Sequence, residues 1–196
     1  MIESEDIFEA VRRGYTDLQM ATPDEIIDYF SDIDAESISG HISNIKGILF
    51  EQEIVQALNE QGMEAALFDA TNHPVSDIFI VDDGEILGEL QLKATDSISY
   101  INDTIALNPD VPIITTSEVA DSFDNIDMVI DSGIDNAALH YAVSSTLFED
   151  TATDVGADIG ADVLSDTASE GLAEVTGESV LPIPISPLGL VLSLLF

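Results

Sequence analysis

The chain has 196 residues, and 4 Lys and Arg against 39 Asp and Glu give it a formal net charge of −35 at pH 7. This balance excludes the broad basic surface with which many proteins hold nucleic acid. The absence of cysteine excludes disulfides and thiolate chemistry. A hydrophobic fraction of 45% is that of a globular protein and excludes a disordered acidic tail.

The negative charge predicts a habitat. At low salt the chain would repel itself, whereas in molar salt the Debye length falls to about 3 Å and the repulsion is screened. We therefore expect a protein from a salt-loaded cytoplasm, such as that of a halophilic archaeon. The start of the chain, MIESEDIFEAVRRG, lacks the apolar core of a signal peptide, which agrees with a cytoplasmic location.

Residues 1–43 predict a helical lead-in. Thr22 is a candidate N-cap, Pro23 suits a first helical position, and acids follow in the first turn. The segment SDIDAESISG, residues 31–40, predicts a loop or a second short helix that ends at Gly40.

Residues 44–150 predict an α/β domain. Apolar residues at helical spacing predict a helix over 44–61 that stops at Gly62. After it we expect strands over 63–70, 75–81 and 85–94, a helix over 97–108, a strand over 111–117, a short helix over 118–123, a strand over 126–131 and a helix over 136–150. The order α-β-β-β-α-β, then α-β-α, predicts a mixed central sheet flanked by helices.

The composition changes after residue 150. Residues 151–179 are rich in Gly, Ala and Asp, with an Asp at every fourth position of one stretch, which predicts a helical segment. Residues 180–196 form an apolar tail interrupted by three prolines, whereas a membrane-spanning helix needs about 20 apolar residues. We expect residues 151–196 to contact the protein itself, a second copy or a partner, with peripheral membrane contact as the alternative.

The strands over 75–81 and 85–94 predict a β-hairpin. Residues 82–84, Asp-Asp-Gly, suit a three-residue loop whose glycine is left-handed. That loop would pair Val81 with Glu85.

The same register would gather polar side chains on one face of the hairpin. It sets Asp77 opposite Glu89, and Gln91 and Lys93 follow on that face because side chains alternate along a strand. The opposite face would be apolar and would carry Ile78, Ile80, Ile86, Leu90 and Leu92.

The polar face suggests metal chemistry. Carboxylate and amide oxygens suit Mg²⁺, which takes one or two carboxylates and keeps several waters. Lys93 beside such a metal could orient the attacking water and offset charge on a phosphate. Lys93 is one of only two lysines in the chain, the other being Lys46. An ordinary charge at a strand end remains the alternative for Lys93, and a solvated helix face remains the alternative for Glu51.

Asp77 followed by Gln91-x-Lys93 on the next strand, after a helix containing GILFEQEIVQALNEQG, resembles the PD-(D/E)xK restriction-endonuclease-like superfamily and its Mrr-like branch. The resemblance covers residues 44–117 and includes the α-β-β-β-α-β order. It implies a nuclease that hydrolyses DNA phosphodiester bonds with Mg²⁺ or Mn²⁺. By position, the implied metal ligands are Asp77, Gln91 and Glu89, and the implied catalytic residues are Lys93, Asp77, Gln91 and Glu51.

Two other interpretations stand beside the nuclease. The first is a catalytically inactive nuclease-like core that serves as a binding or assembly module, and the second, resting on the tail alone, is a membrane-associated effector. The net charge argues against DNA as a partner, because DNA affinity normally comes from cations that release counterions. Arg12 and Arg13, half of all the cations, are expected to pair with local acids, with phosphate binding as the alternative.

Overall fold

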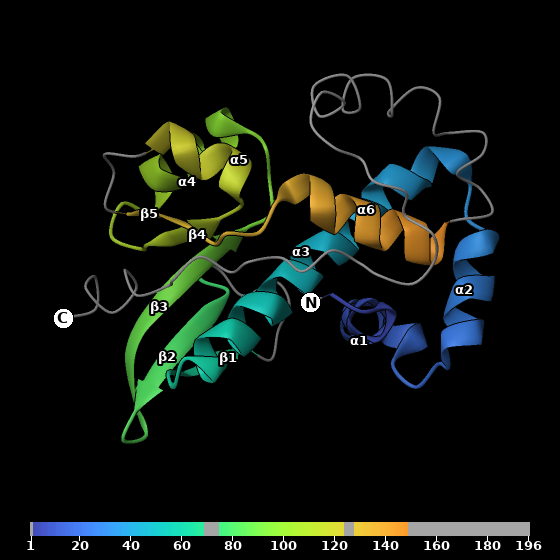
Figure 1. Cartoon of the computed structure of the whole chain (residues 1–196), viewed down its shortest axis with the longest axis horizontal. Helices are drawn as coiled ribbons and strands as arrows, with labels where there is room; N and C mark the ends of the chain where they lie inside the picture. The colour runs from blue at the N-terminus through green and yellow to red at the C-terminus, as the bar shows by residue number, and fades with distance from the viewer. Residues whose placement is uncertain (1, 69–74, 124–127, 149–196) are drawn as a thin grey trace, which may run out of the picture.

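A computed structural model describes residues 2–68, 75–123 and 128–148 (Figure 1). The helices are α1 (Ser4–Gly14), α2 (Pro23–Ser31), α3 (Ala35–Glu60), α4 (Ile98–Leu107), α5 (Ser117–Ala120) and α6 (Asn136–Leu147), with short 3₁₀ turns η1 (Thr16–Leu18) and η2 (Asp121–Phe123). The strands are β1 (Glu64–Leu67), β2 (Ile78–Asp82), β3 (Glu85–Lys93), β4 (Ile113–Thr115) and β5 (Val129–Asp131). The predicted α/β class and the predicted order of these elements are confirmed.

The five described strands form one mixed sheet in the order β1-β2-β3-β4-β5. β1, β2 and β3 are antiparallel neighbours, whereas β3, β4 and β5 run parallel to one another. The parallel register sets Gln91 beside Ile113 and Lys93 beside Thr115. The end of β3 therefore lies between the antiparallel and parallel halves of the sheet.

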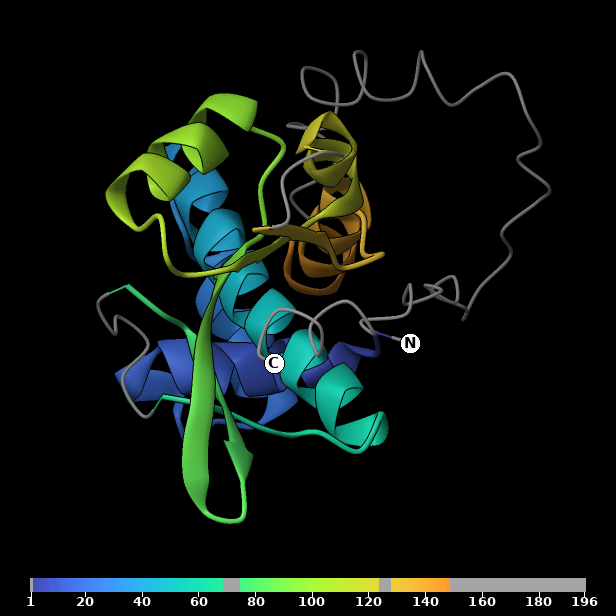
Figure 2. The same ribbon diagram turned by 90° about the vertical axis from the view of Figure 1, so that its left-hand side faces the viewer.

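Apolar side chains bury one face of this sheet and the part of the other face formed by β4 and β5. On one face the buried core joins strand residues such as Leu90 and Leu92 to the helices α1, α2, α3 and α6. On the other face a smaller cluster joins β4 to α4, α5 and η2 through Ile101, Ile113, Val119 and Phe123. Figure 2 shows α3 crossing behind the sheet while the β2–β3 hairpin extends away from α4 and α5.

The long helix α3 corrects the prediction for the lead-in. It runs for 26 residues straight through Gly40, so the predicted helix end at Gly40 and the predicted helix start at residue 44 are wrong. Ile38, Ile42 and Ile45 are buried at helical spacing, and this packing offsets the roughly 1 kcal/mol that a glycine costs inside a helix. The domain boundary expected between residues 43 and 44 consequently falls inside α3.

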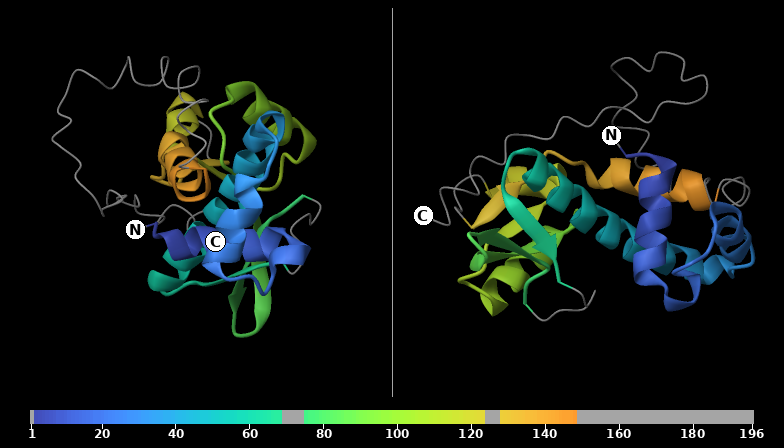
Figure 3. Two further views of the ribbon diagram at one scale, coloured as in Figure 1. Left: turned by 90° about the vertical axis from the view of Figure 1, so that its right-hand side faces the viewer. Right: turned by 90° about the horizontal axis from the view of Figure 1, so that it is seen from below.

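The lead-in is otherwise helical, as predicted. Thr22 caps α2, because its hydroxyl accepts from the Glu25 backbone N–H and the Glu25 carboxylate accepts from the Thr22 backbone N–H. Figure 3 shows α1 lying across α3 with α6 beside them, and these three helices contact one another. The first helices therefore belong to the main core.

The hairpin turn differs from its prediction. The loop has two residues, Asp83 and Gly84, and Asp82 pairs with Glu85. Both loop residues have positive φ, 49° and 83°, as a type I′ turn requires. The predicted three-residue loop is therefore wrong.

A β-bulge restores the predicted grouping of faces. Val81 pairs with Ile86, but Ile80 pairs with Gly88, so one extra residue lies in β3. Continuing this register from Ile78 and Leu90 sets Asp77 beside Gln91 rather than beside Glu89.

The bulge also changes the apolar face. Ile86 lies beyond it and is 58% exposed, so its predicted place on the apolar face is wrong. The other four members of that face, Ile78, Ile80, Leu90 and Leu92, are buried as predicted.

Two expectations concern segments that the structure does not describe. The helix predicted over 151–179 and the apolar tail over 180–196 lie outside the described residues, and so do their predicted contacts. Within the described residues, every helix is too short or too polar to cross a bilayer.

Candidate functional site

Asp77 and Lys93 meet where β2 begins and β3 ends. One carboxylate oxygen of Asp77, Oδ2, accepts from the Leu92 backbone N–H at 2.7 Å and lies 3.4 Å from Lys93 Nζ. The side chains of Asp77 and Lys93 are only 15% and 18% exposed, so water screens the pair weakly. The predicted proximity of these two residues is confirmed, and their catalytic roles remain predictions.

Gln91 lies opposite Asp77 and two residues before Lys93 on β3, and it is buried at 9% exposure. Its side-chain oxygen Oε1 is buried and finds no hydrogen-bond donor among the described residues. A buried oxygen without a donor costs about 1–3 kcal/mol. Since no described donor uses Gln91 Oε1, a cation bound at the site could take this oxygen as a ligand.

Glu51 approaches the pair from α3. Burial and then the charge of Asp77 raise the pKa of Glu51 to about 7, while the cations Arg13 and Lys93 oppose the rise. Glu51 is therefore close enough to feel both members of the Asp77–Lys93 pair. Glu51 is only partly exposed on α3, and its catalytic role remains a prediction.

The two arginines separate in the structure. Arg12 pairs with Glu5 and Glu9 at 2.7 and 2.9 Å, as predicted. Arg13 instead donates from Nη2 to the Phe68 carbonyl oxygen at 2.7 Å, at the end of β1. Its Nε is buried and finds no acceptor among the described residues.

Sequence reasoning did not anticipate that Arg13 would lie near Glu51. Arg13 is held there by its hydrogen bond to Phe68, a residue 55 positions away in the sequence. The available signal was the scarcity of cations, which makes each one worth locating.

Glu89 does not join the group. It is exposed, and its carboxylate accepts from the buried Ser76 hydroxyl at 2.5 Å. The bulge places Gln91, not Glu89, beside Asp77. The structure therefore brings together Asp77, Lys93, Gln91 and Glu51, with Glu89 farther along the same face.

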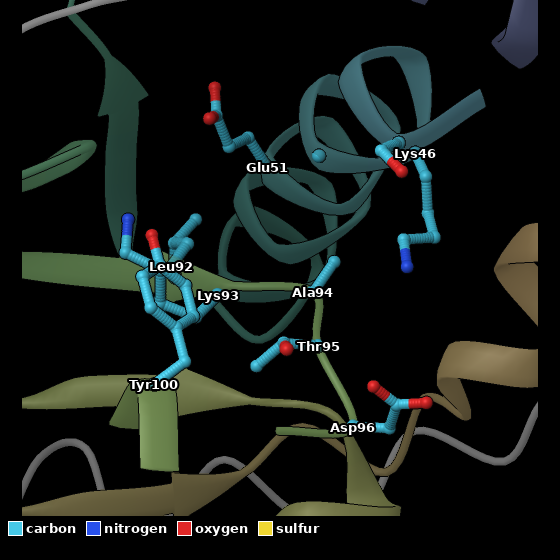
Figure 4. Close-up of a pocket in the computed structure, with 10 residues that line it drawn as sticks. Lys46, Glu51, Leu92, Lys93, Ala94, Thr95, Asp96 and Tyr100 are labelled. Carbon is cyan, nitrogen blue, oxygen red and sulfur yellow. The ribbon is translucent and has the colours of Figure 1, made fainter. Parts of the chain in front are cut away.

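A pocket of about 480 Å³ opens next to Lys93. Figure 4 shows Lys46 pointing from α3 toward the segment from Leu92 to Asp96, whereas the Glu51 carboxylate points away from that segment in this view. Its walls are formed by Ser43, Lys46, Gly47, Glu51, Leu92, Lys93, Ala94, Thr95, Asp96 and Tyr100. Both lysines of the chain line this one pocket.

The donor set fits a hard divalent cation. The described residues contain no group of three or more His, Cys, Asp or Glu side chains placed to hold a metal ion, so any cation here would also need an amide oxygen and water. Two carboxylates, Asp77 and Glu51, together with the donor-free oxygen of Gln91, match the ligands that Mg²⁺ takes along with its waters. A cation there would also stabilise Glu51 in its ionised form.

No protein-family model, no curated protein and no solved structure matches this chain. The geometry of the Asp77–Lys93 site is therefore the basis for inferring a function.

Proposed function

We propose that the chain is a Mg²⁺- or Mn²⁺-dependent endonuclease of the PD-(D/E)xK type, which hydrolyses DNA phosphodiester bonds. One observation carries the proposal: Lys93 Nζ lies 3.4 Å from Asp77 Oδ2, in a weakly hydrated position that also affects Glu51. The pair of Asp77 and Lys93, with the second acid Glu51 near enough to be affected by both, supplies the kinds of group that metal-assisted phosphodiester hydrolysis needs.

The arrangement of elements supports the same proposal. The order α3-β1-β2-β3-α4-β4 corresponds to the αβββαβ core of the restriction-endonuclease-like superfamily that the sequence resembles. Asp77 stands just before β2, and Gln91 and Lys93 stand at the end of β3. These are the positions at which the resemblance expects them.

Each residue has a role in this proposal. Asp77, Gln91 and Glu51 would hold Mg²⁺, which supplies a water that is more easily deprotonated at neutral pH. The Lys93 ammonium would offset the negative charge that develops on the phosphate. The carboxylate of Glu51 could also accept the proton of the attacking water, since its pKa of about 7 suits proton transfer near neutrality.

The net charge of −35 limits how DNA could be held. In molar salt, charges farther away than about 3 Å are screened, so contacts inside the pocket matter most. Lys46 and Lys93 line the pocket, and Arg13 lies near enough to Glu51 to lower its pKa. Two of the four cations thus line the pocket, and a third acts on Glu51.

Cleavage assays in molar KCl test the proposal. Wild-type protein should cleave DNA with Mg²⁺ and not with EDTA. Lys93→Met and Asp77→Asn should each lower the rate by about 100-fold or more, the loss typical of removing one charge-stabilising group. Arg12→Gln, which removes a cation already paired with Glu5 and Glu9, is the matched control and should keep the rate.

Circular dichroism should show that all variants remain folded. Equal activity in wild type and Lys93→Met would remove the nuclease proposal.

An inactive nuclease-like module is the second candidate. It is favoured by the hydrogen bond from the Leu92 N–H to Asp77 Oδ2, which joins β2 to β3 without any metal. Such a module would show no cleavage of any DNA tested and no rise in melting temperature with Mg²⁺.

A further inference from the structure

Lys46 forms no ion pair in the described part of the chain. Its Nζ donates to Asn136 Oδ1 at 2.5 Å, joining α3 to α6. Among the described residues no carboxylate lies within 4.0 Å of Lys46, although Arg12 and Lys93 both have one. Burial lowers the pKa of Lys46, and the charges of Asp96 and Glu118 only partly oppose this shift. In a chain with 39 acids, the lack of an ion pair at Lys46 is unusual.

The pocket offers Lys46 a different kind of partner. An ammonium has three donors, of which Asn136 takes one, so two remain for an anion. Hydroxyl groups of Ser43, Thr95 and Tyr100 line the same pocket. The Tyr100 side chain is 49% exposed, and an exposed aromatic ring can stack on a nucleotide base.

We propose that Lys46 binds the phosphate next to the one held at Lys93, so that the pocket encloses one unpaired nucleotide. The inference rests on the proposed function for the phosphate at Lys93, and it adds the substrate class. A pocket of about 480 Å³ is within the range of volumes that hold small ligands, and an unpaired nucleotide is the part of a DNA strand that could enter it. The substrate is then a single strand or an unpaired strand end.

Two acids lie near Lys46, and their negative charges would repel a phosphate unless other groups engage them. Glu118 is engaged elsewhere, because its carboxylate accepts from the Asn136 and Ala137 backbone N–H groups at 2.8 and 2.9 Å. Asp96 lines the pocket and is exposed, and its charge acts on Lys46. Asp96 would oppose a bound phosphate, so Asp96→Asn should tighten binding.

The binding of DNA is measured in molar KCl with EDTA, which removes the metal and so prevents cleavage. The probes are a short fluorescent oligothymidylate and a blunt duplex of equal length. Wild type should prefer the single strand, and Lys46→Met should weaken its binding by about 10-fold or more, as expected for one charge-assisted hydrogen bond. The slope of log affinity against log salt should become shallower by about 0.7, the value for one phosphate contact on a single strand.

Asn136→Ala is the matched control. It removes the same hydrogen bond between α3 and α6 but keeps the ammonium, so binding should stay near wild type. If Asn136→Ala weakens binding as much as Lys46→Met, Lys46 has only a structural role and the inference fails. Equal affinity for the duplex would also overturn it.

The two proposals fail separately. Binding that depends on Lys46, without any Mg²⁺-dependent cleavage, would keep this inference and remove the nuclease. Cleavage that depends on Lys93, with binding unchanged in Lys46→Met, would keep the nuclease and remove the inference.

Discussion

Glu51 is held in an environment that opposes its charge. Burial comes first among the causes that raise its pKa to about 7, followed by the nearby carboxylate of Asp77. A solvated Glu has an ordinary pKa near 4.3. At Glu51 the folded protein therefore binds more protons than the unfolded chain between these values, so the contribution of this group to stability falls as the pH rises from about 4.5 to about 7.

Glu51→Gln should remove this part of the pH dependence. In EDTA at pH 8 the variant should be more stable than wild type by about 1–3 kcal/mol, because a neutral amide avoids the cost of the buried charge. At pH 4.5 the difference should vanish, since Glu51 is then protonated when folded. Urea unfolding at the two pH values measures both effects.

Glu53→Gln is a useful companion variant. Burial and the charge of Asp6 also raise the pKa of Glu53, but Asp77 and Lys93 are not among the causes. Both variants should gain stability at pH 8. Mg²⁺ should raise the melting temperature of Glu53→Gln as much as that of wild type, and that of Glu51→Gln by less. If Mg²⁺ raises the melting temperatures of both variants equally, the metal does not bind at Glu51.

At the scale of elements, the β2–β3 hairpin depends on its turn. Gly84 has φ of 83°, and a Cβ added there would meet no atom within 4 Å. Any cost of an alanine at this position therefore comes from backbone strain alone, about 1 kcal/mol.

Gly84→Ala should accordingly lower the free energy of unfolding by about 1 kcal/mol. Asp83→Asn should be neutral or slightly stabilising, since Asn-Gly is the preferred pair for a type I′ turn and one negative charge is removed. Denaturant midpoints measure both changes. Because the turn lies at the far end of the hairpin from Lys93 (Figure 1), a loss of DNA cleavage in Gly84→Ala would contradict this account.

The strands and helices could be predicted wherever local pattern decides them. The alternation from Ile78 to Leu92 gave β2 and β3, and Thr22 with Pro23 gave the start of α2. The bulge could not be predicted, because one extra residue in β3 and a shorter loop restore the same alternation. The start of α3 was missed because Gly40 is a common stop, whereas burial of Ile38 and Ile42 keeps the helix going.

In the candidate site, too, only the residues brought together by local pattern could be predicted. Asp77, Gln91 and Lys93 lie on neighbouring strands, so spacing along the hairpin was enough to bring them together. Glu51 was inferred only through the family resemblance. Arg13 comes near Glu51 through the packing of α1 against α3, and Lys46 lines the pocket because α3 packs against β3. No local pattern encodes either contact.

At the scale of the whole molecule, the charge of −35 sets the conditions for folding. Repulsion among the acids favours the expanded unfolded chain, and screening removes that repulsion as the Debye length shrinks. We expect the urea midpoint to rise steadily as KCl increases from low to molar concentration. A midpoint independent of salt would contradict this expectation.

Potassium sulfate at equal ionic strength is the control for that measurement. Screening depends on ionic strength, so both salts should act alike at first. A much larger effect of sulfate would instead indicate the general strengthening of apolar burial by excluded salts.

Helix α3 packs against α1 and α6 and also against β1 and β3. A proteolytic cut or a recombination event within α3 would disrupt its contacts with the other helices and with the sheet at the same time. The first helix cannot be exchanged as an independent module either, since Arg13 ties it to the end of β1. The described part of the chain should therefore unfold in one transition and be inherited as one unit.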